Sequence, residues 1–375
     1  MKKKQLHLFF NHFEQEHFGK DVFLVPYYLG KRLNCEVTIV YPLTKTNKSF
    51  PSVMYGVHLV PLKLIHGFPW WIRNIKNLFY LWKNAQKIDI LMCFHHTPLT
   101  EFRVLLYKHF NPNGVAYVKL DMGKMEDFYS SKELNNPFRR KLTSNFLDKV
   151  DILSCETTGI YNLLKTTSNP KFQYGNKLVL MPNGFDEELL CSYNIKEKSF
   201  EEKENLMITV GRLGTSQKNT EMILRALSKV DMHDWTFYLI GSVEKDFEAV
   251  IETFYQENPD KRDSVVFTGP IYDKKQLWEY YNRAKVFVLT SRWEGSPIVF
   301  PEAKRFCNFI VSTEVWAYYD ITDRGRLGFP IPQEDDVTLA SVLAEITSGN
   351  RIINICGEYD VQQLSWLFMV KCLNL

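Results

Sequence analysis

Apolar runs rich in β-branched residues alternate with segments of helical periodicity along the first half of the chain. A helix is predicted from about Asp21 to Leu33, between the first two runs. Strand, helix and strand in this order indicate a parallel α/β sheet. The strands predicted in this half are QLHLFF (5–10), EVTIVYP (36–42), DILMCF (89–94), GVAYVKL (114–120), DILSC (151–155) and KLVLMP (177–182).

The same alternation restarts after a polar segment, NIKEKSFEEKEN (194–205), which we interpret as a linker. Two successive α/β series predict two Rossmann-like domains, residues 1–185 and 186–359, with a cleft between them. Ligands of open parallel sheets bind beyond the carboxyl ends of the strands, so the residues that follow each strand are the candidates for chemistry. The second series is LMITV (206–210), YLIG (238–241), SVVFTG (264–269), KVFVLT (285–290) and FIVST (309–313).

The composition is that of a globular protein. The chain has 375 residues, 45% of them hydrophobic and 24% charged, which favours two domains. Its longest stretch without a charged side chain, residues 49–62, is shorter than the ~20 residues of a membrane-spanning helix. With no secretion signal recognised, we expect a cytoplasmic location. Seven cysteines without a C-x-x-C pair indicate buried free thiols rather than a disulfide framework or a zinc site.

The net charge of +3 conceals an asymmetry between the halves. Residues 1–190 carry nine more basic than acidic side chains, and the remainder carries six more acidic than basic ones. Residues 66–87, HGFPWWIRNIKNLFYLWKNAQK, hold basic and aromatic side chains and no acid. This combination suits an anionic membrane surface, and we expect no nucleic acid partner. The alternative is an amphipathic core helix with a basic outer face. The side chains concerned are Trp70, Trp71, Arg73, Lys76, Phe79, Tyr80, Trp82, Lys83 and Lys87.

Two cations follow the strand LMITV in the loop GRLGTSQKN. Arg212 and Lys218 lie beside Gly211 at the carboxyl end of a strand. Fixed cations at a glycine-containing turn suit a diphosphate. The alternative is a solvated loop with two ordinary surface charges.

Two carboxylates flank a turn after the strand KVFVLT, in SRWEGSPIVFPEA (291–303). Ser296 is a good helix cap and Pro297 suits the first helical position, so a helix is expected there with its N–H groups free for a phosphate. Pro301 either kinks this helix or moves its start toward Val299. Glu294 and Glu302 suit the vicinal hydroxyls of sugar rings, unless Glu294 only caps a turn and Glu302 lies on a surface helix.

These motifs occur together with FTGPIYDKKQLWEYYNRAKVFVLTSRWEGSPIVFPEA, which contains a Glu-x7-Glu pair, and with MPNGFD (181–186). The combination resembles the retaining glycosyltransferases of family four, which have the GT-B fold. The resemblance implies that Arg212 and Lys218 bind the diphosphate of a nucleotide sugar and offset the charge of the leaving group. It also implies that Glu302 holds the ribose and Glu294 the transferred sugar, near the backbone of Gly295, Ser296, Pro297 and Ile298.

The resemblance further implies a co-substrate, which we expect to be UDP- or GDP-linked, and no other cofactor and no metal. A final helix, about 360–375, should pack back on the first domain. The chain departs from the family at three places: Lys218-Asn219, where the family often has Lys-Gly; Pro301, where it often has Leu; and Asn308, which replaces a frequent Gly after the helix. The departure at Asn308 is expected to be mild, because Asn tolerates the left-handed conformation that a helix end requires.

In the first half, Gly19 of HFGKD stands where relatives approach the donor phosphates, and Asp121 where many place a polar group facing the sugar. Asp121 could stabilise charge at the anomeric carbon, or only cap a turn. His95 and His96 follow a strand, and we interpret them as acceptor-side groups of the cleft, because adjacent histidines do not easily share a metal.

The resemblance, together with these residues, implies a retaining, metal-independent glycosyltransferase of the hexosyltransferase type. The acceptor would be a hydroxyl of a glycan or lipid-linked molecule in bacterial surface polysaccharide synthesis, at the inner face of the cell membrane. Two alternatives are a sugar-nucleotide epimerase of the same fold and a catalytically idle subunit.

Overall fold

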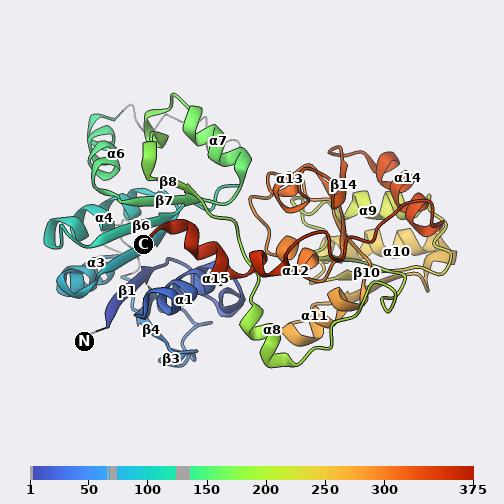
Figure 1. Cartoon of the computed structure of the whole chain (residues 1–375), viewed down its shortest axis with the longest axis horizontal. Coiled ribbons are helices and arrows are strands. Elements are labelled where there is room, and N and C mark those ends of the chain that lie inside the picture. The colour runs from blue at the N-terminus through green and yellow to red at the C-terminus, as the bar shows by residue number, and fades with distance from the viewer. Residues whose placement is uncertain (1–2, 66, 68–73, 124–135) are drawn as a thin grey trace. The chain divides into compact units, whose positions relative to one another are not determined.

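The computed structural model describes residues 3–65, 67, 74–123 and 136–375 (Figure 1). The chain divides into two compact units. The first comprises residues 1–184 together with 366–375, and the second comprises residues 185–365. Each unit has its own parallel sheet and its own buried core, as the two α/β series predict.

The described residues of the first unit form an eight-stranded sheet in the order β3-β4-β2-β1-β5-β6-β7-β8. Neighbouring strands are parallel except β3 and β4. The six strands predicted in this half are confirmed, whereas β3 and β4 were not predicted, since the first spans two residues and the second contains Pro61. The bounds are β1 Lys4–Phe9, β2 Cys35–Pro42, β3 Val53–Met54, β4 Val57–Leu62, β5 Ile90–Phe94, β6 Val115–Lys119, β7 Ile152–Cys155 and β8 Leu178–Leu180.

Helices connect these strands, and their ends follow local chemistry. Helix α1 begins at Asp21 as predicted and ends where Asn34 takes a left-handed conformation, with φ 52°. Thr97 caps α4 by accepting a hydrogen bond from the backbone of Thr100, and a proline follows the cap. The helices are α1 Asp21–Leu33, α3 Ile75–Asn84, α4 Pro98–Phe110, α6 Pro137–Lys149 and α7 Thr158–Thr166.

The second unit has a six-stranded parallel sheet in the order β11-β10-β9-β12-β13-β14. The five predicted strands are confirmed, and β14 was not predicted. The strands are β9 Leu206–Val210, β10 Thr236–Ile240, β11 Val265–Gly269, β12 Val286–Leu289, β13 Phe309–Thr313 and β14 Gly328–Ile331. The helices are α8 Glu187–Tyr193, α9 Thr220–Leu227, α10 Glu248–Glu257, α11 Lys274–Arg283, α12 Val299–Arg305, α13 Tyr318–Ile321 and α14 Asp336–Thr347.

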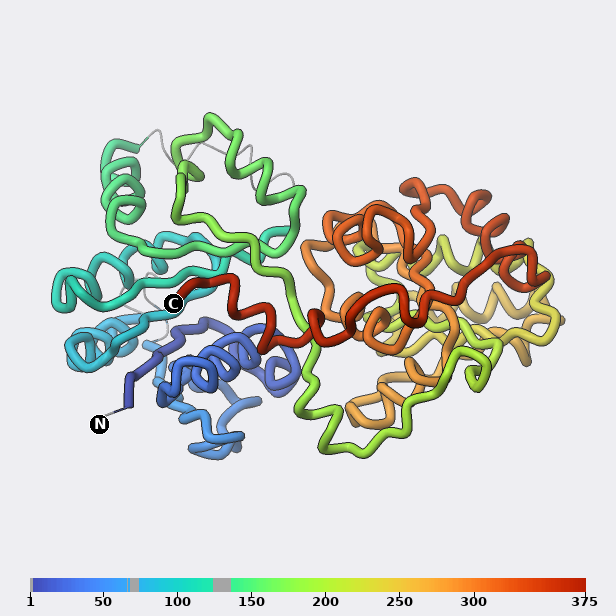
Figure 2. Tube along the Cα trace, in the orientation of Figure 1, coloured from blue at the N-terminus to red at the C-terminus, as the bar shows by residue number. Residues whose placement is uncertain are grey.

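The last residues of the chain belong to the first unit, as Figure 2 shows for the red end of the trace. In place of one continuous helix over about 360–375, the chain forms the 3₁₀ turn Val361–Leu364 in the second unit, followed in the first unit by α15 (Trp366–Met369) and the 3₁₀ turn Val370–Leu373. The side chains of Trp366 and Val370 are buried in the first unit's core. The guanidinium of Arg32 on α1 donates a 2.6 Å hydrogen bond to the Val370 carbonyl.

The linker predicted at residues 194–205 is wrong, because this segment packs on the second unit. Phe200 contacts that unit's core, and the buried Lys203 ammonium donates to the carbonyls of Asn282 and Ala284 at 2.8 and 2.9 Å. Polar residues are stable there because backbone carbonyls satisfy them. The chain instead enters the second unit at Phe185, whose N–H donates to the Leu364 carbonyl at 2.7 Å.

Candidate functional site

The loops that follow β9 and β12 meet in the second unit, because these two strands are neighbours in the sheet. The Lys218 ammonium lies 2.5 Å from a carboxylate oxygen of Glu294. Ser291 donates to the same oxygen at 2.8 Å. The Lys218 and Glu294 side chains are 18% and 11% exposed, so the ion pair is largely screened from solvent. Two residues predicted to bind one ligand are therefore adjacent, although 76 positions separate them in sequence.

Glycines allow the strands below this pair to end close together. A Cβ on Gly241, which has φ 152°, would lie 1.6 Å from the Gly211 carbonyl oxygen, so a side chain there is excluded. The Lys218 side chain crosses Gly211, with Cε 3.1 Å from the place where a Cβ would stand. A side chain at Gly211 would thus crowd the lysine, which would have to shift by a few tenths of an ångström, so the residue predicted at the donor site also has a packing role.

Arg292, in the loop after β12, bonds to residues of the loop after β9. It was not among the site residues predicted from the sequence. Its guanidinium donates to the Ser216 carbonyl at 2.5 Å and to the Asn219 side chain at 2.9 Å, and forms an ion pair with Glu334 at 2.5 Å. This arginine holds the pKa of the Glu334 carboxyl below its ordinary value. The sequence shows a basic residue, Arg292, in SRWEGS, but nothing in the sequence indicated that its side chain contacts the other loop.

Asn219 adopts a left-handed conformation, with φ 48°, and its side chain is buried. Among the common residues, glycine and asparagine adopt this conformation at the lowest cost. The departure at Asn219 is therefore compatible with the same loop path.

Arg212 is exposed. Over the residues that the structure describes, its guanidinium forms no hydrogen bond or ion pair. The structure thus brings Lys218, but not Arg212, into contact with Glu294.

The helix after the turn begins at Val299, which is the later of the two predicted starts. Ser296 is therefore not its cap and Pro297 is not its first residue. Pro301 is the third residue of α12. A backbone N–H at this position has no partner within the helix, so proline, which lacks an N–H, causes no kink there.

Glu302 is buried, at 3% exposure, so the interpretation as a surface helix residue is wrong. Its carboxylate pairs with the Lys274 ammonium and accepts a 3.2 Å hydrogen bond from the Trp278 indole. Both partners lie on α11, whose N-cap residue, Asp273, accepts from the Gln276 N–H at 2.7 Å. Lys274, the first residue of α11, is a second cation of the site that the sequence analysis did not identify.

The explanation given for Asn308 is wrong. The left-handed residue at the end of α12 is Cys307, with φ 56°. Asn308 is buried, and its side-chain amide donates to the carbonyls of Tyr281 and Ala284 at 2.9 and 2.5 Å. Asparagine is used there for its hydrogen bonds and not for its backbone freedom.

In the first unit, Gly19 ends a 3₁₀ turn, Gln15–Gly19, just before α1. A Cβ added to Gly19 would meet no heavy atom of the protein within 4 Å. Packing within the described chain therefore does not require a glycine here, and the proximity to donor phosphates stays a prediction.

Asp121 is exposed at the end of β6 in a left-handed conformation, with φ 48°. Its N–H donates to a carboxylate oxygen of Glu156 at 3.1 Å. Beneath it, the buried Lys119 ammonium lies 2.5 Å from Glu156 and 2.8 Å from Asp21. Burial raises the pKa of Glu156 to about 7, against the opposing effect of Lys119. Asp121 therefore lies next to a buried cluster of charged side chains, Lys119, Glu156 and Asp21. This cluster was not predicted from the sequence.

The acceptor-side interpretation of His96 is not supported by its surroundings. The His96 ring is buried, with Nδ1 2.8 Å from the Tyr174 hydroxyl and Nε2 2.9 Å from a Glu101 carboxylate oxygen. Both nitrogens are thus engaged within the core, and burial lowers the pKa of the ring. His95 is half-buried with φ 59°, and its Nδ1 lies 3.2 Å from the Leu120 carbonyl. In the described part of the chain, no three His, Cys, Asp or Glu side chains gather as metal ligands.

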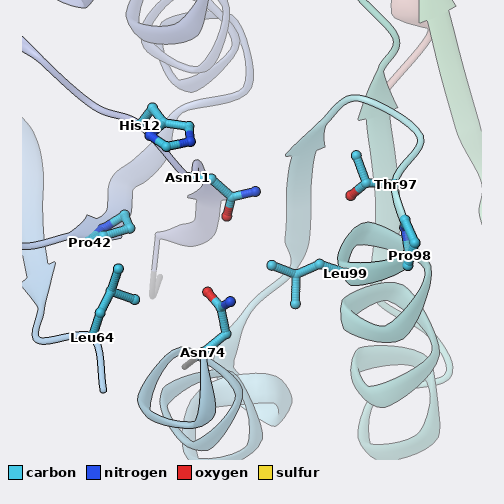
Figure 3. Close-up of a pocket in the computed structure, with 8 residues that line it drawn as sticks. All are labelled: Asn11, His12, Pro42, Leu64, Asn74, Thr97, Pro98 and Leu99. Atoms are coloured by element: carbon cyan, nitrogen blue, oxygen red, sulfur yellow. The ribbon is translucent and has the colours of Figure 1, made fainter. Parts of the chain in front are cut away.

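A cavity of about 370 Å³ opens at the carboxyl ends of β1, β2 and β5 (Figure 3). Asn11 lies on one side of it, and its side-chain oxygen accepts a 2.9 Å hydrogen bond from the buried Arg103 guanidinium. That bond orients the amide, because the oxygen is held and the NH₂ group is left to donate elsewhere. The lining residues are Asn11, His12, Pro42, Leu64, Asn74, Thr97, Pro98 and Leu99.

Comparison with known proteins places the second unit in context. Residues 204–348 match the family model of the glycosyl transferases group 1. The match covers Lys218, Lys274, Glu294 and Glu302. The chain is 32% identical to the amylovoran biosynthesis glycosyltransferase AmsD of Erwinia amylovora over 117 residues. This stretch covers 31% of each chain. The chain spans about a third of the length of this curated relative.

Two solved structures share the fold of the whole chain. Sucrose-phosphate synthase from Thermosynechococcus elongatus aligns with a TM-score of 0.71 and 17% identity, covering 99% of this chain and 98% of that one. Anabaena HepE, solved in complex with UDP and glucose, aligns with a TM-score of 0.64 and 13% identity, covering 98% and 97%. The chain has the GT-B fold, as the sequence predicted.

Proposed function

We propose that the chain is a glycosyltransferase that moves a sugar from a nucleotide-diphosphate sugar to a hydroxyl of a glycan or lipid-linked acceptor, in the synthesis of a surface polysaccharide. The observation that carries the proposal is the ion pair of Lys218 with Glu294, within the segment that matches the family model. The relative AmsD, named for amylovoran biosynthesis, supports the polysaccharide context.

The donor would bind at the carboxyl ends of β9 and β12. Lys218 supplies a positive charge there that a diphosphate can share with Glu294, and the exposed Arg212 supplies a second one without giving up an existing partner. Glu294 would accept hydrogen bonds from sugar hydroxyls, and Glu302 from a ribose. Because Glu302 already binds Lys274 and Trp278, this carboxylate is held in one orientation before the ligand arrives.

Transfer would retain the anomeric configuration, with the acceptor hydroxyl attacking from the face that the diphosphate leaves. Lys218 and Arg212 would offset the charge that develops on the diphosphate, so the proposal assigns no step to a metal. Asp121, exposed above Lys119 and Glu156, would face the transferred sugar.

The acceptor would bind on the first unit, where the cavity beside Asn11 combines amide and hydroxyl groups with the apolar side chains of Leu64 and Leu99. Sugar rings present hydroxyls at their edges and C–H groups on their faces, so a mixed lining of this kind suits them.

A membrane-bound acceptor accords with α3, whose outer face is apolar and basic. Ile75, Phe79 and Trp82 are 48%, 58% and 49% exposed, and Lys76 and Lys83 are exposed among them. A membrane-binding segment and an amphipathic core helix would both have a basic outer face. Exposed aromatic side chains on that face favour the membrane-binding interpretation. Trp70 and Trp71 lie outside the described residues. None of the helices in the described ranges is long and apolar enough to cross a bilayer.

The test compares the protein with a Lys218→Met variant and a Lys229→Met control. Lys229 also forms an ion pair, with Asp336 at 2.5 Å, but lies on the turn after α9, at the opposite end of that helix from Lys218. We expect one of UDP, GDP and ADP to raise the melting temperature of the parent protein, since a ligand of the folded state stabilises it. Lys218→Met should lower turnover by roughly a hundredfold or more, and Lys229→Met should not.

Ordinary turnover in Lys218→Met would refute the role of this lysine. The anomeric configuration of the product, read by NMR, tests retention. The same assays separate the alternatives: an epimerase would convert the sugar nucleotide with no acceptor present, and an idle subunit would bind the nucleotide without turning over its sugar.

A further inference from the structure

The Arg292 guanidinium binds the loop that carries Lys218 at two points. It donates to the Ser216 carbonyl at 2.5 Å and to the side-chain oxygen of Asn219 at 2.9 Å. Ser216 and Asn219 lie on either side of Lys218 in the sequence. The guanidinium therefore fixes the short stretch of backbone from which the Lys218 ammonium extends. Its third nitrogen, Nε, donates to Glu334 at 2.5 Å.

The backbone around Arg292 adds two bonds between the same loops. The Arg292 N–H donates to the Gln217 carbonyl at 2.8 Å, and the Gln217 side-chain amide donates to the Trp293 carbonyl at 3.1 Å. Glu294 follows Trp293 directly in the sequence. The two loops are therefore bonded to each other right up to the residues of the Lys218–Glu294 ion pair.

The three acceptors of Arg292 require a guanidinium. A carbonyl, an amide oxygen and a carboxylate are bound by three different nitrogens of one planar group, whereas lysine has a single nitrogen. Each of these nitrogens has a partner in the protein. Arg212, in contrast, has none among the residues that the structure describes, so it is the arginine available to a ligand.

We propose that Arg292 is a positioning residue of the donor site, which holds Lys218 in place for the diphosphate and does not touch the ligand itself. The inference rests on the proposed function and adds that the diphosphate of the donor depends on this arginine more than the nucleoside does. Glu302, proposed to bind the ribose, is held by Lys274 and Trp278 on α11. Those contacts do not involve Arg292, so its loss leaves them in place.

The experiment compares Arg292→Ala with Arg225→Ala in the full chain. Arg225 is the matched control, because it pairs with Asp336 at 3.1 Å and lies 3.8 Å from Glu334, the carboxylate that Arg292 also binds. Within the described residues, however, Arg225 forms no bond to the loop of Lys218.

The probes are UDP, GDP, ADP and their three nucleosides, with binding read from the melting temperature at increasing ligand concentration. We expect Arg292→Ala to weaken several-fold the nucleoside diphosphate that binds the parent protein and to leave its nucleoside unchanged. Turnover should fall roughly tenfold to a hundredfold, since a misplaced charge stabilises the leaving diphosphate less well. Arg225→Ala should match the parent in both assays.

Chemical rescue distinguishes this role from a loss of folding. Millimolar guanidinium should restore part of the turnover of Arg292→Ala, and methylammonium should not, because only the former reproduces the planar group. Arg292→Lys should stay impaired for the same reason. Lys218→Met should not respond to guanidinium, since it lacks the ammonium that Arg292 positions.

Asn219→Gly separates positioning from direct contact with the ligand. Glycine keeps the left-handed conformation of residue 219 and removes the amide oxygen that Arg292 binds. If Arg292 acts through this loop, the double variant should lose about as much turnover as Arg292→Ala alone, because the two changes break one connection. Costs that add would show a direct contact with the ligand and overturn the proposal.

Equal weakening of the nucleoside diphosphate and the nucleoside in Arg292→Ala would also overturn it. A parent protein that binds none of the three nucleotides would refute the proposed function, and this inference with it. Unchanged diphosphate binding in Arg292→Ala, beside normal binding by the parent, would refute the role of Arg292 alone.

Discussion

The Lys218 and Glu294 side chains compensate each other's charge. Each has given up most of its contact with water, and a charge in such a place must be paired. A diphosphate that takes the lysine as its partner frees the carboxylate, which can then accept hydrogen bonds from the sugar. This ion pair thus couples binding of the diphosphate and of the sugar of the proposed donor. A phosphate alone or a sugar alone is therefore expected to bind more weakly than a molecule that contains both.

Glu156 gives a pH dependence that belongs to a single residue. Its pKa is about 7 in the folded protein and near the ordinary value of 4.5 when unfolded. Between these values the folded state holds a proton that the unfolded state has lost, so the free energy of unfolding decreases as the pH rises through this window. Replacement by glutamine, which stays neutral, should remove up to about 3 kcal/mol of that decrease.

Urea unfolding at pH 5 and pH 8 measures this effect, followed by a probe in the first unit. The exposed Glu36→Gln in the same unit replaces a glutamate by the same residue at a solvent-exposed position and should leave the pH dependence as it is in the parent. An equal slope in Glu156→Gln and the parent would show that Glu156 is not the titrating group.

At the scale of elements, α3 presents an apolar and basic face on a helix without acidic residues. Replacing Phe79 and Trp82 by serine removes the aromatic contact with a membrane and should reduce sedimentation with anionic vesicles several-fold. Replacing Lys76 and Lys83 by glutamate should weaken binding more strongly at low salt, because headgroup attraction is screened.

Phe138→Ser is the control for the aromatic substitutions, since this residue is 73% exposed on α6 of the same unit. Binding that is indifferent to the lipid charge, or that falls equally in the control, would contradict the role of α3.

The predicted elements show which parts of the fold local sequence determines. Strands such as β9 and β13 were predicted to the residue, because a buried parallel strand is a continuous β-branched run. The β3–β4 pair and the linker were missed, since an edge strand tolerates proline and a polar segment can pack when backbone carbonyls satisfy it.

The candidate site divides in the same way. Glu294 and Lys218 could be found from motifs at strand ends, but Arg292 and Lys274 act across loops and helices. His96 follows a strand just as a site residue would, and only the buried partners Tyr174 and Glu101 reveal a core role. Sequence position gives the end of the sheet at which a residue lies, but not whether its side chain turns outward.

At the scale of the whole molecule, the first unit is discontinuous in sequence. Its core takes Trp366 and Val370 from the end of the chain, after the second unit has been completed. The first unit therefore cannot reach its final packing until the last residues are present, whereas residues 185–365 form the second unit alone.

This organisation predicts that two buried tryptophans act on different units. Trp366→Ala should cost about 3–5 kcal/mol and destabilise the first unit, although the residue immediately follows the second unit in sequence. Trp278→Ala, equally buried on α11, should have a similar cost within the second unit. Hydrogen exchange separates the two, because amides exchange faster where a unit opens more often. Trp366→Ala should accelerate exchange in β1 and β5 and spare β9 and β12, and Trp278→Ala should do the reverse. Faster exchange in β9 and β12 after Trp366→Ala would mean that the last residues stabilise the second unit instead, since a local cavity weakens the core that it lies in.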